Sequence, residues 1–578
     1  MEAMIVNLCI ILALFLWIPS TFGYGILGIK ILQHFALKLG FHQRFIKSVD
    51  LKFNLLLKGI VGITTLSIIV QFLHFFTAIN HYVSIIFLLF GLLYFMKSFK
   101  QEISFIKQQT PYFLPLILAL LTGFILASIL SIRVESAYDT GLYHIQAIKW
   151  IQEYPIIFGI ANIHTRFGFN NILYNFAALT EVSHIFPSIR SFLLGEIFAF
   201  FFFTSTFLSL CALRAKLLND IFMCVSFIII SINFWWLGGG MYAEGILGIL
   251  GLSLVAYIIF MIEKSLTHTF LAFVLLFVMA FFSIYIKISA FFLLVCALLL
   301  YFQYHRYSLT SLKNCIYICG FCVILGIFWA LKGICISGMI AYPAKVGYLG
   351  FLPWVIDESR RAGEVLGIHN WAKVAGSPDR EVLLQDYSWI KVWFKLFFWN
   401  GTFKMLLQLS FYACGFLLLL LIMRRIYFTQ LKPYVFIFLG LILGIIFWFI
   451  SAPDPRFGFQ YFFPVFAFSA SFVLQYFLSH KEHYVLGLCF LYICASLSVN
   501  HIHFNAIDRK ESQKIPQVAL ASKHTDSNLL IYYPKEGDRV YDAPLPAAAY
   551  FNSKLSKKTF LGRDMYVIES HKGKKEHQ

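Results

Sequence analysis

Eight ionisable residues in this sequence stand beside long apolar runs, where a charge is costly unless it is paired or functional. A carboxylate at such a place can act as a general base, and a cation can bind a phosphate. We expect all of them to lie at or near one side of the fold and therefore predict one cavity that opens to that side. They are Asp139, His144, His164, Arg166, Glu244, Lys287, Asp454 and Arg456.

Asp139 is the strongest catalytic candidate of this set. It stands in the segment 138–144, Tyr-Asp-Thr-Gly-Leu-Tyr-His, closely after an apolar run. A spacing of three residues then gives one apolar stripe, formed by Leu142, Ile145, Ile148 and Ile151. This pattern predicts a helix lying on a membrane surface with Asp139 at its start. Asp139 then either only caps that helix or acts as a general base on a hydroxyl acceptor.

The other candidates each have a plain structural interpretation beside a functional one. Asp454 and Arg456 stand in a short loop with two prolines. They either form a salt bridge that only stabilises this turn or belong to the site. Residues 238–244, Gly-Gly-Gly-Met-Tyr-Ala-Glu, form a flexible turn or let a ligand approach the backbone. His164 and Arg166 either contact a phosphate or are solvated on a loop.

Lys287 and Arg456 are the cations that we expect to meet a donor phosphate, because cations near developing charge stabilise it most where water is scarce. The alternative is that Arg456 pairs with Asp454 and that Lys287 reaches the lipid headgroups. His144 has no partner at metal-ligand spacing. We therefore predict no metal site and no cofactor.

The elements that must position these residues are membrane helices. Of 578 residues, 60% are apolar and only 13% are charged, and the mean hydropathy is +0.77. Runs of roughly 20 apolar residues, enough to cross a bilayer, follow one another about fourteen times. We expect helices at 4–27, 54–78, 81–97, 112–132, 190–213, 219–237, 243–262, 267–286, 288–304, 314–337, 404–423, 433–451, 459–479 and 484–500.

The distribution of Lys and Arg predicts the orientation of these helices. Alternate loops hold nearly all of these residues, and the intervening short loops hold only Lys287 and Arg456. Because cytoplasmic loops collect positive charge, we expect both termini and the long segments 133–189 and 338–403 on the extracytoplasmic side. The net charge of +18 is thus a topology signal, and no basic patch suggests a nucleic-acid partner.

Three parts follow from this map. Residues 1–110 form an N-terminal three-helix membrane unit, residues 111–500 a membrane core with the two long segments, and residues 501–578 a small extracytoplasmic domain. In that last part, alternating apolar residues at 529–533 and 565–568 predict a small mixed appendage. The fold class is therefore an all-α polytopic membrane protein.

A long first extracytoplasmic loop that starts with an Asp at the end of a membrane helix resembles the GT-C superfamily of polytopic glycosyltransferases. The segments 139–179, with Asn-Ile-His-Thr-Arg-Phe-Gly-Phe-Asn at 162–170, and 541–546, Tyr-Asp-Ala-Pro-Leu-Pro, also resemble a bacterial family of multi-spanning membrane proteins of unassigned function. Two features depart from the GT-C pattern. Three helices precede the one that leads into this loop, and Thr140 follows Asp139 where many members have a second acid.

This resemblance implies an enzyme of the bacterial cytoplasmic (inner) membrane that binds membrane lipid. It would move a sugar from a polyprenyl-phosphate donor to a cell-surface glycan or lipid acceptor, with Asp139 as the catalytic carboxylate. The alternatives are a polymerase or ligase of lipid-linked oligosaccharides, which would share the outward cavity, and a transporter or flippase of lipid-linked sugars. A third alternative is a catalytically inert membrane scaffold, but it would not explain why the charged residues are expected on one side of the fold.

Overall fold

The structure is a computed structural model. It describes residues 2–38, 49–109, 113–133, 137–212, 217–232, 243–305, 309–377, 380–401, 404–423, 428–477 and 515–569. The expected helix 484–500 and the glycines at 238–240 lie outside these ranges, as does the last part of the expected helix 219–237.

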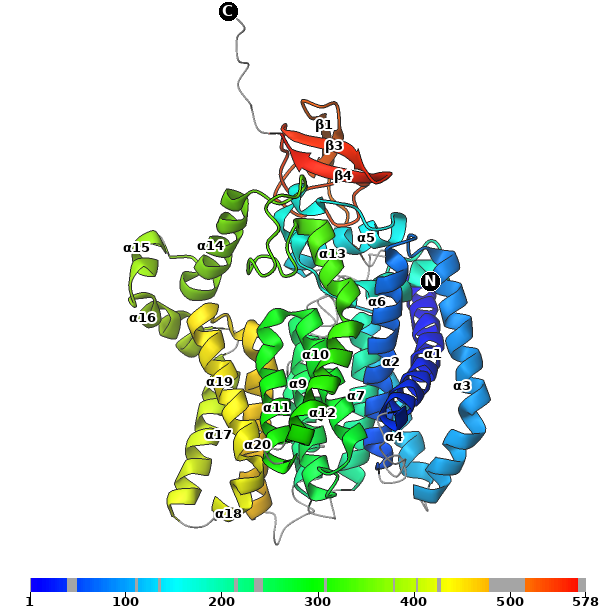
Figure 1. Cartoon of the computed structure of the whole chain (residues 1–578), viewed down its shortest axis with the longest axis vertical. Coiled ribbons are helices and arrows are strands. Elements are labelled where there is room, and N and C mark those ends of the chain that lie inside the picture. Colours follow the sequence, from blue (N-terminus) through cyan, green and yellow to red (C-terminus); the bar gives the residue numbers. More distant parts are fainter. Residues whose placement is uncertain are drawn as a thin grey trace, which may run out of the picture.

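A bundle of long helices makes up most of the described chain (Figure 1). In the described ranges, nine helices are long and apolar enough to cross a membrane, or ten if one bent pair counts as a single span. The chain is thus a largely helical, multi-spanning membrane protein, as the sequence predicts, whereas the count of fourteen stays a prediction. The long helices are α1 (Glu2–Lys38), α2 (Leu51–His74), α3 (His81–Gln109), α4 (Phe113–Ser131), α7 (Leu194–Cys211), α9 (Ala243–Glu263), α11 (Phe291–His305), α19 (Val435–Ser451) and α20 (Phe459–Phe477).

The span of α11 reaches the required length together with the 3₁₀ turn before it, over Ile288–His305. Three further helices have shorter apolar stretches: α8 (Leu218–Ile232), α10 (Phe270–Ile286) and α17 (Lys404–Ile422), the last over Leu406–Ile422. The bent pair consists of α12 (Leu309–Leu325) and α13 (Ile327–Ser337), which meet at 44°. The sequence predicts one helix over 314–337, and the structure shows that this stretch is broken into two. Gly326 stands at the break, where an added Cβ would lie 2.2 Å from the hydroxyl oxygen of Tyr285. That hydroxyl also donates to the carbonyl of Cys322 at 2.7 Å, so it caps the end of α12.

Other boundaries differ because hydropathy detects only the part of a helix that crosses hydrocarbon. The expected helix 81–97 continues as α3 to Gln109, through Lys97, Lys100 and Glu102, which are residues that favour helices in water as well. Likewise α1 continues to Lys38, beyond the predicted end at 27.

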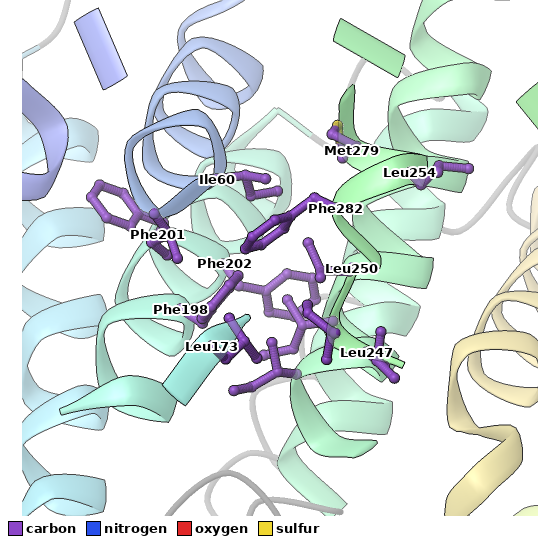
Figure 2. Packing of buried hydrophobic residues seen from close by; sticks show 14 of the residues in the cluster. Ile60, Leu173, Phe198, Phe201, Phe202, Leu247, Leu250, Leu254, Met279 and Phe282 are labelled. Carbon is purple, nitrogen blue, oxygen red and sulfur yellow. The ribbon is translucent and has the colours of Figure 1, made fainter. Parts of the chain in front are cut away.

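The centre of the bundle is formed by α2, α7, α9 and α10. Figure 2 shows Phe202 of α7 and Phe282 of α10 between Ile60 of α2 and Leu250 of α9, whereas Phe201 of α7 lies on the side of α2. Nearly every residue of α9 is buried, so this helix is apolar all round and has no water-facing side. The peripheral helices α1 and α3 instead keep large exposed apolar side chains, as lipid contact allows.

One end of the bundle, which we call the loop end, carries most of the irregular structure and the strands (Figure 1). It contains the π-helical turn η2 (Thr140–His144), α5 (Ile145–Glu153) and α6 (Leu173–Thr180), and the short 3₁₀ turns η3 (Ile160–Asn162), η4 (Thr165–Gly168) and η5 (Val182–His184). The second long segment adds α14 (Glu358–Val374), α15 (Arg380–Gln385), α16 (Trp389–Trp393) and η9 (Phe394–Trp399). The turns η8 (Ile288–Ala290) and η11 (Pro455–Gly458) lie at the same end, and α18 (Phe428–Leu431) and η10 (Lys432–Tyr434) lie elsewhere.

Two antiparallel hairpins stand beyond the loop end. They pair β1 (Leu520–His524) with β2 (Leu530–Pro534), and β3 (Leu555–Phe560) with β4 (Arg563–Ile568). Strands β2 and β4 occupy the two segments of alternating apolar residues in the sequence. The backbones of Phe158 and Tyr566 are joined by a 2.9 Å hydrogen bond, and the amide of Asn162 donates to the Tyr566 carbonyl at 3.0 Å. The strands are therefore fixed to the loop that follows α5.

Candidate functional site

Asp139 lies at the start of the helix that the sequence predicts. This helix runs from Tyr138 to Glu153, and the π-helical turn η2 interrupts it directly after Asp139. The Asp139 side chain makes no capping hydrogen bond, so it does not serve as the helix cap. Single π turns inside α-helices occur often at functional sites, because they widen the helix and redirect the side chains beside them.

Arg166 holds one oxygen of Asp139. Its Nη1 donates to Asp139 Oδ1 at 2.8 Å, and its Nε donates to Glu364 Oε1 of α14 at 3.1 Å. The turn η4 positions Arg166, since the Nδ1 of His164 accepts a hydrogen bond from the Arg166 backbone at 3.2 Å and caps this turn. His164 thus positions Arg166 and makes no contact of its own with the Asp139 side chain.

Arg456 stands on the other side of the Asp139 carboxylate. Its Nη1 is 4.0 Å from Asp139 Oδ2, while its Nε and Nη2 contact the carboxylate of Asp454 at 3.2 and 2.9 Å. Asp454 also accepts from the backbone of Arg456 at 3.0 Å and from Trp371 Nε1 of α14 at 2.9 Å. The salt-bridged turn is therefore real, and it aims the rest of the Arg456 guanidinium at Asp139.

A second ion pair lies beside this turn. Lys287 Nζ is 2.7 Å from Glu244 Oε1 at the start of α9, and it stands 3.7 Å from the ring centre of Phe457. Glu244 also interacts electrostatically with Arg456. Lys287 is thus held by a carboxylate and an aromatic ring.

His144 lies behind the site and is only 3% exposed. Its ring contacts those of Tyr143 and Tyr174, and its Nδ1 is 3.3 Å from the Thr140 hydroxyl. Burial lowers the pKa of His144 to about 4, so its ring is neutral at physiological pH. The sequence places His144 among the substrate-binding residues, but this burial favours a supporting role under η2.

The four carboxylates of the site differ in exposure. The side chain of Asp139 is 23% exposed, against 11% for Glu244, 11% for Glu364 and 4% for Asp454. In the part of the chain that the structure describes, Oδ2 of Asp139 receives no hydrogen bond, whereas both oxygens of Asp454 accept several. Asp139 is therefore the most exposed of the four carboxylates, and it has an oxygen available to a ligand.

The described residues contain no group of three or more His, Cys, Asp or Glu side chains that could hold a metal ion. Three cations, Arg166, Lys287 and Arg456, lie among the four carboxylates. What this arrangement offers chemically is an oriented proton acceptor with fixed positive charge close to it.

The comparisons with known proteins give one match. The model of a family described as a domain of unknown function, DUF8201, matches residues 4–463. The chain belongs to this family. The DUF8201 match begins in α1 and ends in α20, so it includes the three N-terminal helices and all eight candidate residues but not the strands. No curated protein and no solved structure matches the chain.

Sequence reasoning missed three side chains of this DUF8201 site. Glu364 and Trp371 reach the site from α14. Glu364 lies 198 residues after Arg166 in the sequence, although the two side chains are hydrogen-bonded. Tyr143 lies with its ring centre 5.5 Å from the Arg166 guanidinium. For α14 the only signal is the mixture of charges and tryptophans in segment 338–403, which suggests a surface helix without saying what it faces.

Proposed function

We propose that this chain is a membrane glycosyltransferase of the GT-C kind, which moves a sugar from a polyprenyl-phosphate donor to a hydroxyl of a glycan or lipid acceptor. In the reaction, the acceptor oxygen bonds to the anomeric carbon and the bond from that carbon to the phosphate oxygen breaks. The polyprenyl phosphate leaves with the bonding electrons, and Asp139 Oδ2 takes the proton of the acceptor hydroxyl.

The observation that carries this proposal is the arrangement around Asp139. A general base must be oriented and must keep an oxygen within reach of the hydroxyl proton. Arg166 holds Oδ1 at 2.8 Å, which orients the carboxylate, while Oδ2 accepts no hydrogen bond from the described residues. The π turn η2 and the His164 cap position these two side chains from the same loop.

The cations near Oδ2 supply the second requirement of the reaction. A leaving phosphate gains negative charge, and fixed cations stabilise it most where water is scarce. Arg456 presents Nη1 4.0 Å from Asp139 Oδ2, and Lys287 lies beside it over Phe457. Both cations are held by carboxylates, so binding a phosphate requires that it displace or share these contacts.

One observation favours the second candidate, a transporter or flippase of lipid-linked sugars. Transporters often contain broken helices and buried ionisable residues near the middle of the bilayer. The described chain contains such a broken helix, at Gly326, and a buried ionisable residue, Lys332, whose Nζ contacts the amide oxygen of Asn175 at 3.1 Å. The orientation of the Asp139 carboxylate by Arg166 is the observation that favours the transferase over this candidate.

The two candidates separate on Asp139→Asn, which keeps the size of the side chain and removes its ability to accept a proton. If Asp139 is the base, cells with this variant contain normal amounts of protein and roughly a hundredfold to ten-thousandfold less glycan product. Asp386→Asn, an exposed acid of the same long segment as α14, serves as the matched control and should leave the product unchanged. Full product with Asp139→Asn would contradict the proposal.

A further inference from the structure

A cleft of about 390 Å³ lies apart from the Asp139 cluster, where the strands meet the membrane bundle. Its walls come from three parts of the chain. Val6 of α1 forms one wall, residues 188–190 before α7 another, and residues 515–520 and 540–544 of the C-terminal part the third. A cleft of this volume has the size of a small-molecule site.

The charges of this cleft are balanced within the protein. Arg190 lies 2.8 Å from Glu181 and 3.3 Å from Asp542, and Lys149 lies 3.0 Å from Asp542. Two cations therefore face two carboxylates. A phosphate or carboxylate entering the cleft would meet the charge of Asp542, and an ammonium would meet that of Arg190, so a neutral ligand is favoured on both counts.

Both the cation Arg190 and the carboxylate Asp542 nevertheless keep hydrogen-bonding capacity that the protein does not use. Arg190 has five N–H donors, and its hydrogen bonds go to Gln152, Glu181 and Asp542. The bonds that Asp542 receives on its side chain all fall on Oδ1 in the described part of the chain. Both side chains remain partly exposed, at 28% and 32%. A hydroxyl group fits such a pair, because it accepts from the guanidinium and donates to the carboxylate.

Apart from Ser188 and Gln517, whose side chains are polar, most of the other lining residues are apolar. They include Ile189, Val518 and Val540, and two prolines, Pro516 and Pro544. Tyr541 at the floor has a φ of +43°, a left-handed conformation that is costly for a residue with a side chain and that occurs often in ligand sites. Rigid apolar surface beside a few directed polar groups suits a ring that carries C–H on its faces and hydroxyls on its rim.

We propose that this cleft binds a neutral, hydroxyl-rich sugar segment of one or two rings. Its floor is joined to the candidate site, since the backbone N–H groups of Val540 and Tyr541 both donate to the carbonyl of Gly141 at 2.9 Å, two residues after Asp139. That the bound sugar belongs to the acceptor rests on the proposed function. The binding itself does not depend on it.

Binding is tested on the full-length protein in detergent with an array of neutral, acidic and amino oligosaccharides. Wild-type protein should bind neutral oligosaccharides in preference to the charged ones. Ser188→Trp fills the cleft from an exposed wall position and should weaken this binding at least tenfold. Ser522→Trp, the same change at an exposed position of β1 outside the cleft, should bind as wild type does. Gln517→Trp fills the cleft from the opposite wall and replaces Ser188→Trp if that variant does not fold.

The proposal is overturned if wild-type protein binds no neutral oligosaccharide, prefers charged ones, or binds them equally well with the cleft filled. Asp139→Asn should bind the array as wild type does. Unaltered transfer in Asp139→Asn with intact array binding would therefore refute the proposed function and leave the cleft proposal standing, whereas absent array binding in wild-type protein would refute the cleft proposal alone.

Discussion

At the scale of single residues, the candidate site is a set of ion pairs in which each cation is fixed by a carboxylate. Arg166 joins Asp139 to Glu364, Arg456 joins Asp139 to Asp454, and Lys287 pairs with Glu244. Partly buried pairs of this kind are costly to break, because one charge is then left without a partner. The ion pairs therefore fix where the charged side chains of the site lie. A general base requires such a fixed position, because it must stand within hydrogen-bond distance of the proton that it takes.

Arg456→Lys tests the guanidinium. Lysine has one compact charge and cannot contact both oxygens of Asp454 while it also faces Asp139. We expect the dissociation constant for a labelled polyprenyl-phosphate sugar, measured in nanodiscs, to rise about tenfold or more, which corresponds to roughly 1.4 kcal/mol. Arg361→Lys, which alters an ion pair with Glu358 on the surface of α14, is the control. An unchanged constant in Arg456→Lys removes this residue from the donor site.

His164 makes the stability depend on pH. Burial lowers its pKa to about 3 in the folded protein, against roughly 6.5 in an unfolded chain. Between these values the unfolded chain binds a proton that the folded protein does not, so the free energy of unfolding rises with pH across this window and falls as the pH drops below 6.5. At pH 5 the loss from this residue amounts to at most about 2 kcal/mol.

His164→Asn removes the titrating ring and keeps an oxygen that can cap η4. We expect the melting temperature of this variant in detergent to fall less between pH 7 and pH 5 than that of wild-type protein. Equal falls in the two proteins would show that His164 is not the source of the pH dependence.

At the scale of elements, the site depends on the contact between η2 and the C-terminal part. Gly141 lies in η2, and a Cβ added there would stand 2.6 Å from the ring of Tyr541. Neither the ring nor the helix can move without disturbing the two backbone hydrogen bonds at the Gly141 carbonyl. A glycine is thus required here by close packing, and the helix that carries Asp139 is held in place from outside.

Gly141→Ala should therefore lower stability by about 1–3 kcal/mol through overpacking. It should also reduce glycan product about tenfold or more, since it shifts the segment that holds Asp139. Gly367→Ala is the matched control, because nothing lies within 4 Å of the Cβ that it adds on α14. A Gly141→Ala protein with the melting temperature and product level of wild type would show that this contact does not position the site.

The sequence predicts the individual helices well and their interruptions poorly. Apolar runs locate α2, α9 and α19 because the property that defines them, about 20 mostly apolar residues, is local. The break at Gly326 depends on Tyr285, which arrives from another helix, and no local signal marks it. For the same reason the eight candidate residues are visible as charges in apolar surroundings, whereas Glu364 is one of many charges in a polar segment and is found only through its contact with Arg166.

At the scale of the whole molecule, the loop end gathers the Asp139 cluster, the α14 helix and the C-terminal strands (Figure 1). The distribution of Lys and Arg predicts that this end faces away from the cytoplasm. The prediction matters for function, because a donor on a polyprenyl carrier must be reached from the same side of the membrane as the acceptor.

Cysteine accessibility tests this orientation. Ser359 stands exposed in the first turn of α14, and Lys264 stands exposed between α9 and α10 at the opposite end of the bundle. In a background in which the exposed Cys211 is replaced by serine, a membrane-impermeant thiol reagent should label Ser359→Cys in intact spheroplasts. Lys264→Cys should react only after the membrane is permeabilised. The reverse pattern would show that the orientation is wrong.

The central claim is that Asp139 accepts a proton during sugar transfer, and transfer in a purified system tests it most directly. Purified protein is reconstituted in liposomes with a labelled polyprenyl-phosphate sugar and an acceptor glycan, and the new glycosidic product is measured over time. We predict product with wild-type protein and a rate roughly a hundred to ten thousand times lower with Asp139→Asn, at unchanged donor binding. Equal rates for the two proteins would contradict the account, and so would wild-type protein that moves the labelled lipid across the bilayer without forming a glycosidic bond.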